Sequence, residues 1–153
     1  MSLGLYLHIP YCFSKCRYCD FYSAPGQRGV PRAYVDALLR ELSRFAPDAP
    51  LRPDTLYFGG GTPSLLDPAD AARLISAAQP LPGAEITLEA NPETVTEDSL
   101  RAFREAGVNR ISFGVQSARD SQLKTLGRPH TAKQARAAFA AARRAGFENI
   151  SGD

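Results

Sequence analysis

Three cysteines near the start of the sequence are the residues best suited to chemistry. Cys12, Cys16 and Cys19 are the only cysteines of the 153-residue chain, and their spacing is C-x3-C-x2-C. Thiolates gathered in this way suit zinc, copper(I) or an iron–sulfur cluster. A cubane [4Fe-4S] cluster normally takes four cysteines. Three thiolates from one loop would therefore leave one iron without a protein ligand, free to bind an exchangeable molecule.

Three other interpretations of the cysteines compete with a cluster. A disulfide would leave one thiol over, and a chain without a secretion signal is expected in a reducing compartment. Three cysteines and one histidine form an ordinary structural zinc set, and His8 lies four residues before Cys12. Zinc ligands usually come as two separated pairs, however, whereas these cysteines fall within eight residues. Lys15, Arg17 and Asp20 beside the thiols argue against a buried, unreactive segment.

The composition is typical of a soluble globular domain, with 44% hydrophobic and 22% charged residues. A chain of this length buries roughly 70% of its unfolded surface, which is enough for a real core. The net charge of +2 is too small to indicate nucleic acid or an anionic membrane as a partner. The N-terminus lacks the pattern of a signal peptide, and no stretch is apolar enough to span a bilayer. We therefore expect a cytoplasmic protein.

Strand and helix patterns alternate along the chain. Residues 3–9 alternate in the period of a strand, while Asp67 and Pro68 are a typical cap and first residue of a helix. Gly107 and Gly146 are placed to end two further helices. The patterns predict strands over residues 3–9, 55–58, 85–90, 110–115 and 148–153, and helices over residues 31–45, 68–78, 96–106, 120–126 and 131–145.

This order predicts an α/β fold with a parallel sheet and right-handed crossovers. It amounts to (βα)4 followed by a fifth strand that only begins. A closed (βα)8 barrel needs about 250 residues. We therefore expect residues 1–153 to be the N-terminal part of a larger TIM-like barrel, truncated at the start of strand 5.

The predicted strands carry polar side chains on one face. In a barrel, one face of each strand packs on the helices and the other points inside, with sites at the C-terminal strand ends. His8, Glu89 and Gln116 lie on the polar face near those ends, where the cysteine loop also begins. Four strands in succession are therefore expected to direct polar groups into one space beside the cysteines.

Several short motifs follow the cysteines in a fixed order. They are Y-L-H-I-P-Y-C from Tyr6, G-G-G-T-P at 59–63, L-E-A-N-P at 88–92, G-V-Q-S at 114–117 and L-G-R at 126–128. With these landmarks the chain resembles the oxygen-independent coproporphyrinogen III oxidase family of radical S-adenosylmethionine (SAM) proteins, from Tyr6 to Asp153. The resemblance implies a radical SAM barrel, a [4Fe-4S] cluster whose open iron is chelated by SAM, and an electron donor protein. Electron transfer to SAM then gives a 5'-deoxyadenosyl radical.

The resemblance also implies roles for individual residues. It implies that Cys12, Cys16 and Cys19 ligate the cluster. It implies SAM contacts from Tyr6, Tyr18, Gly60, Gly61, Thr62, Glu89, Gln116, Arg128 and Asp153. The glycines and Thr62 would meet the methionine amino group, Glu89 the ribose or the ammonium, and Gln116 the ribose.

Two residues, Arg128 and His8, have a plainer interpretation beside the functional one. Arg128 would bind the SAM carboxylate with its planar fork, although position in the family alone distinguishes it from a solvated surface arginine. His8 would serve substrate or radical chemistry, or would simply be hydrogen-bonded inside the barrel. We expect His130 on the surface or in a loop.

One departure from the family pattern bears on the activity. The decarboxylating oxidases carry a fourth cysteine two residues beyond the third, where this chain has Phe21. Cys19-Asp20-Phe21 resembles the branch described as haem chaperones, which bind haem and pass it to an acceptor, and the haem-binding residues are expected beyond Asp153. We therefore favour a haem chaperone, which makes oxidase activity doubtful. The alternatives are the oxidase, acting on a porphyrinogen, and a zinc-binding structural module.

The expected truncation leads to a first prediction. The isolated 153 residues should expose strand five as an unpaired edge and tend to aggregate, because an open edge offers free backbone donors and acceptors. Light scattering during thermal unfolding would measure this. A cooperative melt of a monomer would count against truncation.

Overall fold

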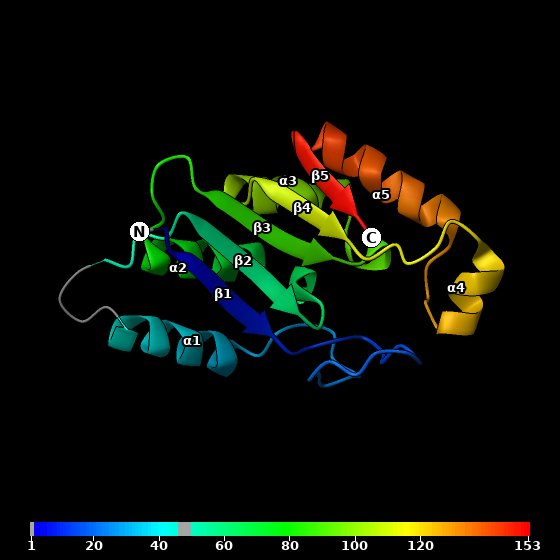
Figure 1. Ribbon diagram of the computed structural model, residues 1–153, viewed down its shortest axis with the longest axis horizontal. Coiled ribbons are helices and arrows are strands. Elements are labelled where there is room, and N and C mark those ends of the chain that lie inside the picture. The colour runs from blue at the N-terminus through cyan, green and yellow to red at the C-terminus, as the bar shows by residue number, and fades with distance from the viewer. Residues whose placement is uncertain (1, 46–49) are drawn as a thin grey trace.

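The chain forms a five-stranded parallel sheet with helices packed against it, in a computed structural model that describes residues 2–45 and 50–153. The strands follow one another in the order β1-β2-β3-β4-β5, so each pairs with its neighbour in sequence (Figure 1). The strands are β1 Gly4–Ile9, β2 Thr55–Gly60, β3 Glu85–Ala90, β4 Arg110–Phe113 and β5 Asn149–Gly152. The α-helices are α1 Arg32–Phe45, α2 Pro68–Ala78, α3 Glu97–Glu105, α4 Asp120–Leu126 and α5 Ala132–Arg144, and two 3-10 turns are η1 Pro63–Leu65 and η2 Pro92–Thr94. The predicted α/β fold, an open part of a TIM-like barrel, is confirmed.

The helices begin where the sequence offers caps. The Asp67 side chain accepts a hydrogen bond from the Ala69 amide, which satisfies one of the free donors of α2. Thr96 and Thr131 each form a reciprocal capping box at the start of α3 and α5. These caps explain why the predicted starts of α2, α3 and α5 lie within one residue of the observed ones.

Five strand boundaries differ from the prediction, and the two ends of β5 each lie one residue inside the predicted range. Leu3 lies outside β1 and is exposed. β2 continues to Gly60 because Ile9 of β1 still pairs with it. β4 ends at Phe113 rather than residue 115, because the Val115 amide bonds back to the Phe113 carbonyl and Gln116 adopts a left-handed conformation with φ 66°. The chain therefore turns out of the sheet at this point.

The register of the sheet separates an apolar face from a polar one. Leu7, Phe58, Leu88, Ile111 and Ile150 form one row across the five strands. Most of this row is buried beneath the helices, with Phe58, Leu88 and Ile111 fully inaccessible. The polar side chains of the next row lie on the other face, as the alternation predicts.

All five strands point the same way, so their C-terminal ends meet at one edge of the sheet (Figure 1). The loop that carries the cysteines leaves β1 at this edge, and α4 lies at the same end. Among the described residues, no helix has the length and apolar character needed to cross a bilayer.

The core supplies a prediction about stability. Phe58→Ala should lower the free energy of unfolding by about 3–5 kcal/mol, because it removes a completely buried ring from the centre of the sheet. Equilibrium unfolding in urea measures the change. Phe45→Ala is the control, since that ring is 75% exposed and its loss should change the free energy by less than about 0.5 kcal/mol. Equal losses from the two variants would contradict the assigned core.

Candidate functional site

The cysteine loop is folded back on itself and fastened to the sheet. The Cys12 amide donates to the Ala24 carbonyl at 3.1 Å, and the Ala24 amide donates to the Pro10 carbonyl at 2.6 Å. A further bond of 3.1 Å runs from the Arg17 amide to the Leu126 carbonyl at the end of α4. All three cysteines are free thiols of intermediate exposure. The backbone of the loop is therefore held both next to the end of β1 and at the end of α4, and the three sulfurs extend from this fixed backbone.

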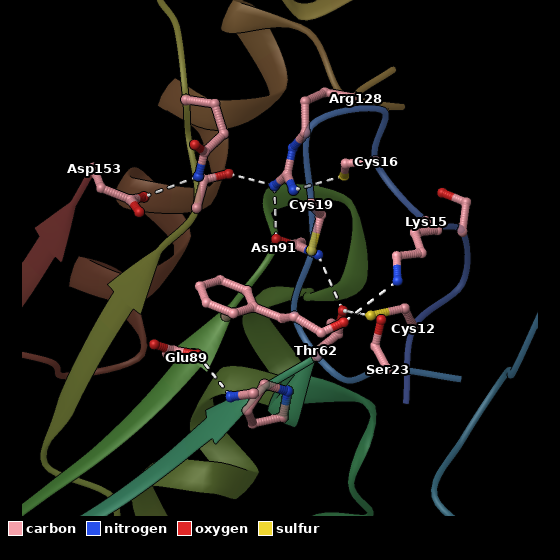
Figure 2. A pocket seen from close by; sticks show the side chains of 18 of the residues that line it. Cys12, Lys15, Cys16, Cys19, Ser23, Thr62, Glu89, Asn91, Arg128 and Asp153 are labelled. Atoms are coloured by element: carbon pink, nitrogen blue, oxygen red, sulfur yellow. Dashed lines mark hydrogen bonds between the residues drawn. The ribbon is translucent and has the colours of Figure 1, made fainter. Parts of the chain in front are cut away.

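A cavity of about 360 Å³ lies beneath this loop, over the ends of β2, β3 and β4 (Figure 2). This volume falls in the range of small-molecule sites. The predicted site residues that line it are Cys12, Cys16, Cys19, Tyr18, Gly60, Gly61, Thr62, Glu89, Gln116, Arg128 and Asp153. The fold thus brings eleven of the thirteen predicted residues around one space.

The other two predicted residues, Tyr6 and His8, do not line this cavity. The Tyr6 hydroxyl lies 3.2 Å from His8 Nδ1, and His8 Nε2 lies 3.2 Å from the Tyr22 carbonyl. The Tyr6 ring stacks on Tyr57 and is 54% exposed. An aromatic group made of Tyr6, His8 and Tyr57 therefore lies beside the cavity, on the polar face of β1 and β2.

Two glycines at the end of β2 allow close approach, Gly61 to the cysteine loop and Gly60 to His8 of β1. A Cβ on Gly61 would lie 2.8 Å from the Tyr11 carbonyl oxygen and 2.9 Å from Cys12 Sγ. At Gly60 the backbone has φ 117°, and a Cβ would lie 2.7 Å from the His8 ring. These contacts are shorter than any real side chain permits, so glycine is required for this close approach.

Glu89 is held at the cavity wall by two donors. Its Oε1 accepts a hydrogen bond of 2.7 Å from the Tyr57 hydroxyl, and its Oε2 accepts one of 3.2 Å from the Gly60 amide. Burial, together with this hydrogen bond and the negative charge of Glu89, raises the pKa of Tyr57 well above its ordinary value. Tyr57 therefore stays protonated and remains a donor to the carboxylate.

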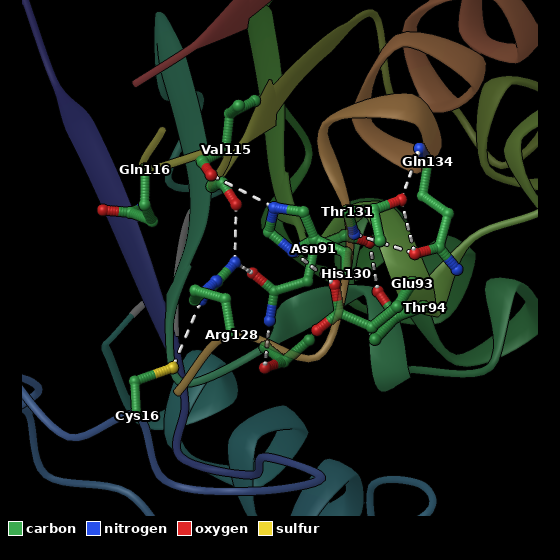
Figure 3. Close-up of polar contacts among 12 residues, drawn as sticks. Cys16, Asn91, Glu93, Thr94, Val115, Gln116, Arg128, His130, Thr131 and Gln134 are labelled. Atoms are coloured by element: carbon green, nitrogen blue, oxygen red, sulfur yellow. Dashed lines mark hydrogen bonds and ion pairs between the residues drawn. The ribbon is translucent and has the colours of Figure 1, made fainter. Parts of the chain in front are cut away.

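Arg128 reaches into the site instead of lying on the surface (Figure 3). One terminal nitrogen, Nη1, donates to Cys16 Sγ at 3.4 Å. The other, Nη2, donates to Asn91 Oδ1 at 2.6 Å and to the Gly114 carbonyl. Burial lowers the pKa of Arg128, but the hydrogen bond to Cys16 and the nearby negative charges outweigh it, so the pKa lies above its ordinary value.

Gln116 and Asp153 meet at the far wall of the cavity, although they are far apart in sequence. The backbone amide of Gln116 donates to the backbone carbonyl of Asp153 at 2.7 Å. The side-chain amide nitrogen Nε2 of Gln116 donates to Asp153 Oδ1 at 3.3 Å. The left-handed backbone of Gln116 turns it toward the end of β5. The two residues therefore offer amide and carboxylate groups to the same side of the space.

His130 lies in a loop, which is one of the two positions expected from the sequence, but its burial was not predicted. The loop joins α4 to α5, and the His130 side chain is completely buried. Its Nδ1 lies 3.1 Å from Glu93 Oε2, and its Nε2 lies 3.1 Å from the Val115 carbonyl (Figure 3). The ring thus ties η2 to the segment after β4. No periodic pattern in the sequence indicates this burial.

Asn91 is a site residue to which the sequence motifs assigned no role. It follows β3 directly, and its side chain joins Arg128 to Thr62. Its position immediately after a strand end is the one signal in the sequence that could have identified it.

The donors around the cavity fit an iron–sulfur cluster with a further ligand. Among the described residues, no three histidine, cysteine, aspartate or glutamate side chains come together as ligands of a single metal ion. In a cubane cluster each thiolate binds a different iron, so the sulfurs lie farther apart than around one ion. Two buried polar atoms of the cavity lining, Ser23 Oγ and Arg128 Nε, have no partner within the described chain. They are therefore available to a bound molecule.

Comparison with known proteins identifies related sequences. The model of the radical SAM superfamily matches residues 6–153. The heme chaperone HemW of Escherichia coli (strain K12) is 45% identical over 99% of this chain. The mitochondrial radical S-adenosyl methionine domain-containing protein 1 of Bos taurus is 41% identical over 92% of it. The chain spans only 42% and 33% of these two relatives.

Solved structures share the same fold. Coproporphyrinogen III oxidase (HemN) from Escherichia coli, described as a radical SAM enzyme, superimposes with a TM-score of 0.84 at 31% identity. That match covers 99% of this chain and 36% of the oxidase. The cobalamin-dependent radical enzyme OxsB has a TM-score of 0.64 at 16% identity, which supports the fold alone.

The close approach at Gly61 gives a prediction for the site. Gly61→Ala should lower the free energy of unfolding by about 1–3 kcal/mol, because the added methyl group must displace the Tyr11 carbonyl or Cys12. Urea unfolding followed by circular dichroism measures the change. Gly29→Ala serves as the control, since its Cβ would meet nothing closer than 3.9 Å. If both variants were equally stable, the close packing of β2 against the loop would be wrong.

Proposed function

This chain belongs to the radical SAM superfamily, and we propose that it is the N-terminal part of the core barrel of a haem chaperone. The observation that carries the proposal is the cavity that gathers the three cysteines with the other predicted binding residues at the strand ends. The sequence of the chain fits the haem chaperone branch of the oxygen-independent coproporphyrinogen III oxidase family. Because the chain spans less than half of each of these relatives, the activity of the whole protein is inferred here from a part of it.

Cys12, Cys16 and Cys19 would hold the [4Fe-4S] cluster that membership of the superfamily implies. Thr62 and Arg128 already direct hydrogen bonds at two of these sulfurs, which is the environment that thiolate ligands require. When bound, the cluster and SAM together would supply one-electron reduction of a sulfonium. A zinc site made of the three cysteines and His8 is less favoured, because the His8 ring lies outside the cavity, with its two nitrogens 3.2 Å from the Tyr6 hydroxyl and the Tyr22 carbonyl.

The remaining residues of the cavity would bind and orient SAM. Gly61 brings the backbone close to the first cysteine, and Gly60 and Gly61 would leave room for the methionine amino group. Arg128 Nε is a buried donor without a partner in the described chain, and it would meet the SAM carboxylate. Glu89 and Gln116 would accept and donate hydrogen bonds at the ribose.

Four further residues have less direct roles. Tyr18 and Asp153 line the cavity and would make additional SAM contacts. Tyr6 lies next to the cavity and would reach SAM from its edge. His8 would act on the molecule that lies beyond SAM, since its ring adjoins Gly60 but faces the aromatic group outside the cavity.

Phe21 distinguishes the chaperone from the oxidase. It stands where the decarboxylating oxidases carry a fourth cysteine, and its side chain is largely exposed beside the cavity. The higher identity to the heme chaperone, 45% against 31% for the solved oxidase, supports the same choice. The protein would therefore bind haem through its remaining segments and pass it to an acceptor, while an electron donor protein would serve its cluster.

The cluster can be tested in the full-length protein. Anaerobic reconstitution with iron and sulfide should give the electron paramagnetic resonance signal of a reduced [4Fe-4S] cluster, and SAM should alter that signal. Cys12→Ser, Cys16→Ser and Cys19→Ser should each lower cluster content by about tenfold or more, because each removes one of three ligands. Tetrahedral zinc bound at the cysteine loop, or a spectrum that does not respond to SAM, would contradict the proposal.

The choice between chaperone and oxidase needs a separate measurement. Purified protein should retain haem through gel filtration, and should form no protoporphyrinogen from coproporphyrinogen when supplied anaerobically with SAM and a reductant. The solved oxidase from Escherichia coli is the positive control. Formation of protoporphyrinogen by this protein would favour the oxidase instead.

A further inference from the structure

A continuous set of hydrogen bonds links two of the cysteines through the end of β3 (Figures 2 and 3). Thr62 Oγ1 lies 3.5 Å from Cys12 Sγ and also receives a bond of 3.2 Å from Asn91 Nδ2. Asn91 Oδ1 accepts a bond of 2.6 Å from Arg128 Nη2, and Arg128 Nη1 lies 3.4 Å from Cys16 Sγ. Asn91 thus stands at the centre of the path.

The chemistry of these groups fixes the direction of each bond. Arginine has only donors, so the Asn91 atom that faces Arg128 must be the carbonyl oxygen. The Asn91 amine is then left facing Thr62 and must donate to it. Because Thr62 accepts this bond, its single hydroxyl hydrogen is free to point at Cys12. Both ends of the path therefore donate to sulfur.

Burial strengthens this arrangement. Thr62 is only 2% exposed, and Asn91 and Arg128 are both partly buried. Hydrogen bonds in such surroundings are stronger than in water and polarise one another. The Asn91 backbone is itself held, because its carbonyl accepts a bond of 2.8 Å from the Thr94 hydroxyl. The amide therefore has a fixed position from which to orient its two neighbours.

We infer that Asn91 is a positioning residue that orients the Thr62 hydroxyl onto Cys12 and steadies Arg128 against Cys16, and so raises the reduction potential of the bound cluster. Hydrogen bonds to the sulfurs are among the factors that set the potential of an iron–sulfur cluster, because they stabilise the more negative, reduced state. The inference rests on the proposed function, since only a loop that holds a cluster has a potential to adjust. Arg128 has a second anchor at the Gly114 carbonyl, so the orientation of Thr62 is the part that depends on Asn91 alone.

Asn91→Asp is the substitution that tests the direction of the bonds. A carboxylate at this position accepts from both neighbours, so the Thr62 hydroxyl would turn from Cys12 to an oxygen of the new carboxylate. We expect the midpoint potential of the cluster to fall. At a fixed potential, the ratio of reduced to oxidised cluster should be about tenfold lower, which corresponds to a shift of about 59 mV for a one-electron couple. Spectroscopic redox titration of the reconstituted full-length protein, without SAM, measures this.

A double-variant cycle separates orientation from the added charge. Thr62→Val removes the hydroxyl and should itself lower the potential, whereas Thr62→Ser keeps the hydroxyl and should leave the potential near that of the wild type. In the Thr62→Val background, Asn91→Asp should then cause much less than its full shift. A full shift in that background would show that charge alone acts and would overturn the inference.

Asn109→Asp is the matched control. Asn109 also bridges two groups, the Ile86 amide and the Ala84 carbonyl, but at the opposite end of the strands. Its carboxylate variant should lose stability in urea without a change in potential. If Asn91→Asp left the potential unchanged while the cluster stayed intact, the role of Asn91 would be refuted, but the proposed function would stand. Failure of the wild type to form a [4Fe-4S] cluster would instead refute the proposed function, and this inference with it.

Discussion

Parallel pairing is the constraint on which the site depends. Since all five strands run in one direction, every C-terminal end lies at the same edge, and residues distant in sequence are collected there. The pairing of β1 with β2 continues past the sheet, where the Gly61 amide donates to the Ile9 carbonyl and the Thr62 amide to the Tyr11 carbonyl. The hydrogen bonding of the sheet thus continues to Tyr11, the residue directly before the first cysteine.

Polar groups at this edge are supported by one another and not only by the backbone. Glu89 is held by a tyrosine and a backbone amide, and Arg128 by an asparagine and a carbonyl. Each group keeps a defined orientation because its partners are partly removed from water. The same surroundings leave two buried atoms, Ser23 Oγ and Arg128 Nε, without partners in the described chain, and in the proposed function a bound ligand would supply them.

The sequence predicted the fold well because its signals are local. The cap at Asp67 and the alternation over residues 3–9 each depend on a few adjacent residues. The burial of His130 and the part played by Asn91 could not be predicted in this way, because each depends on partners 15 to 37 residues away. The cysteines and motif residues were found, but their division between a cavity and a separate aromatic surface appears only in three dimensions.

The bond between Arg128 and Cys16 spans 112 residues of sequence. During synthesis on the ribosome, the thiols emerge long before the arginine that steadies one of them. Contacts between such distant residues form late, because the intervening chain must first be ordered. The Cys16 sulfur can therefore receive this hydrogen bond only after the segment that follows α4 has been translated.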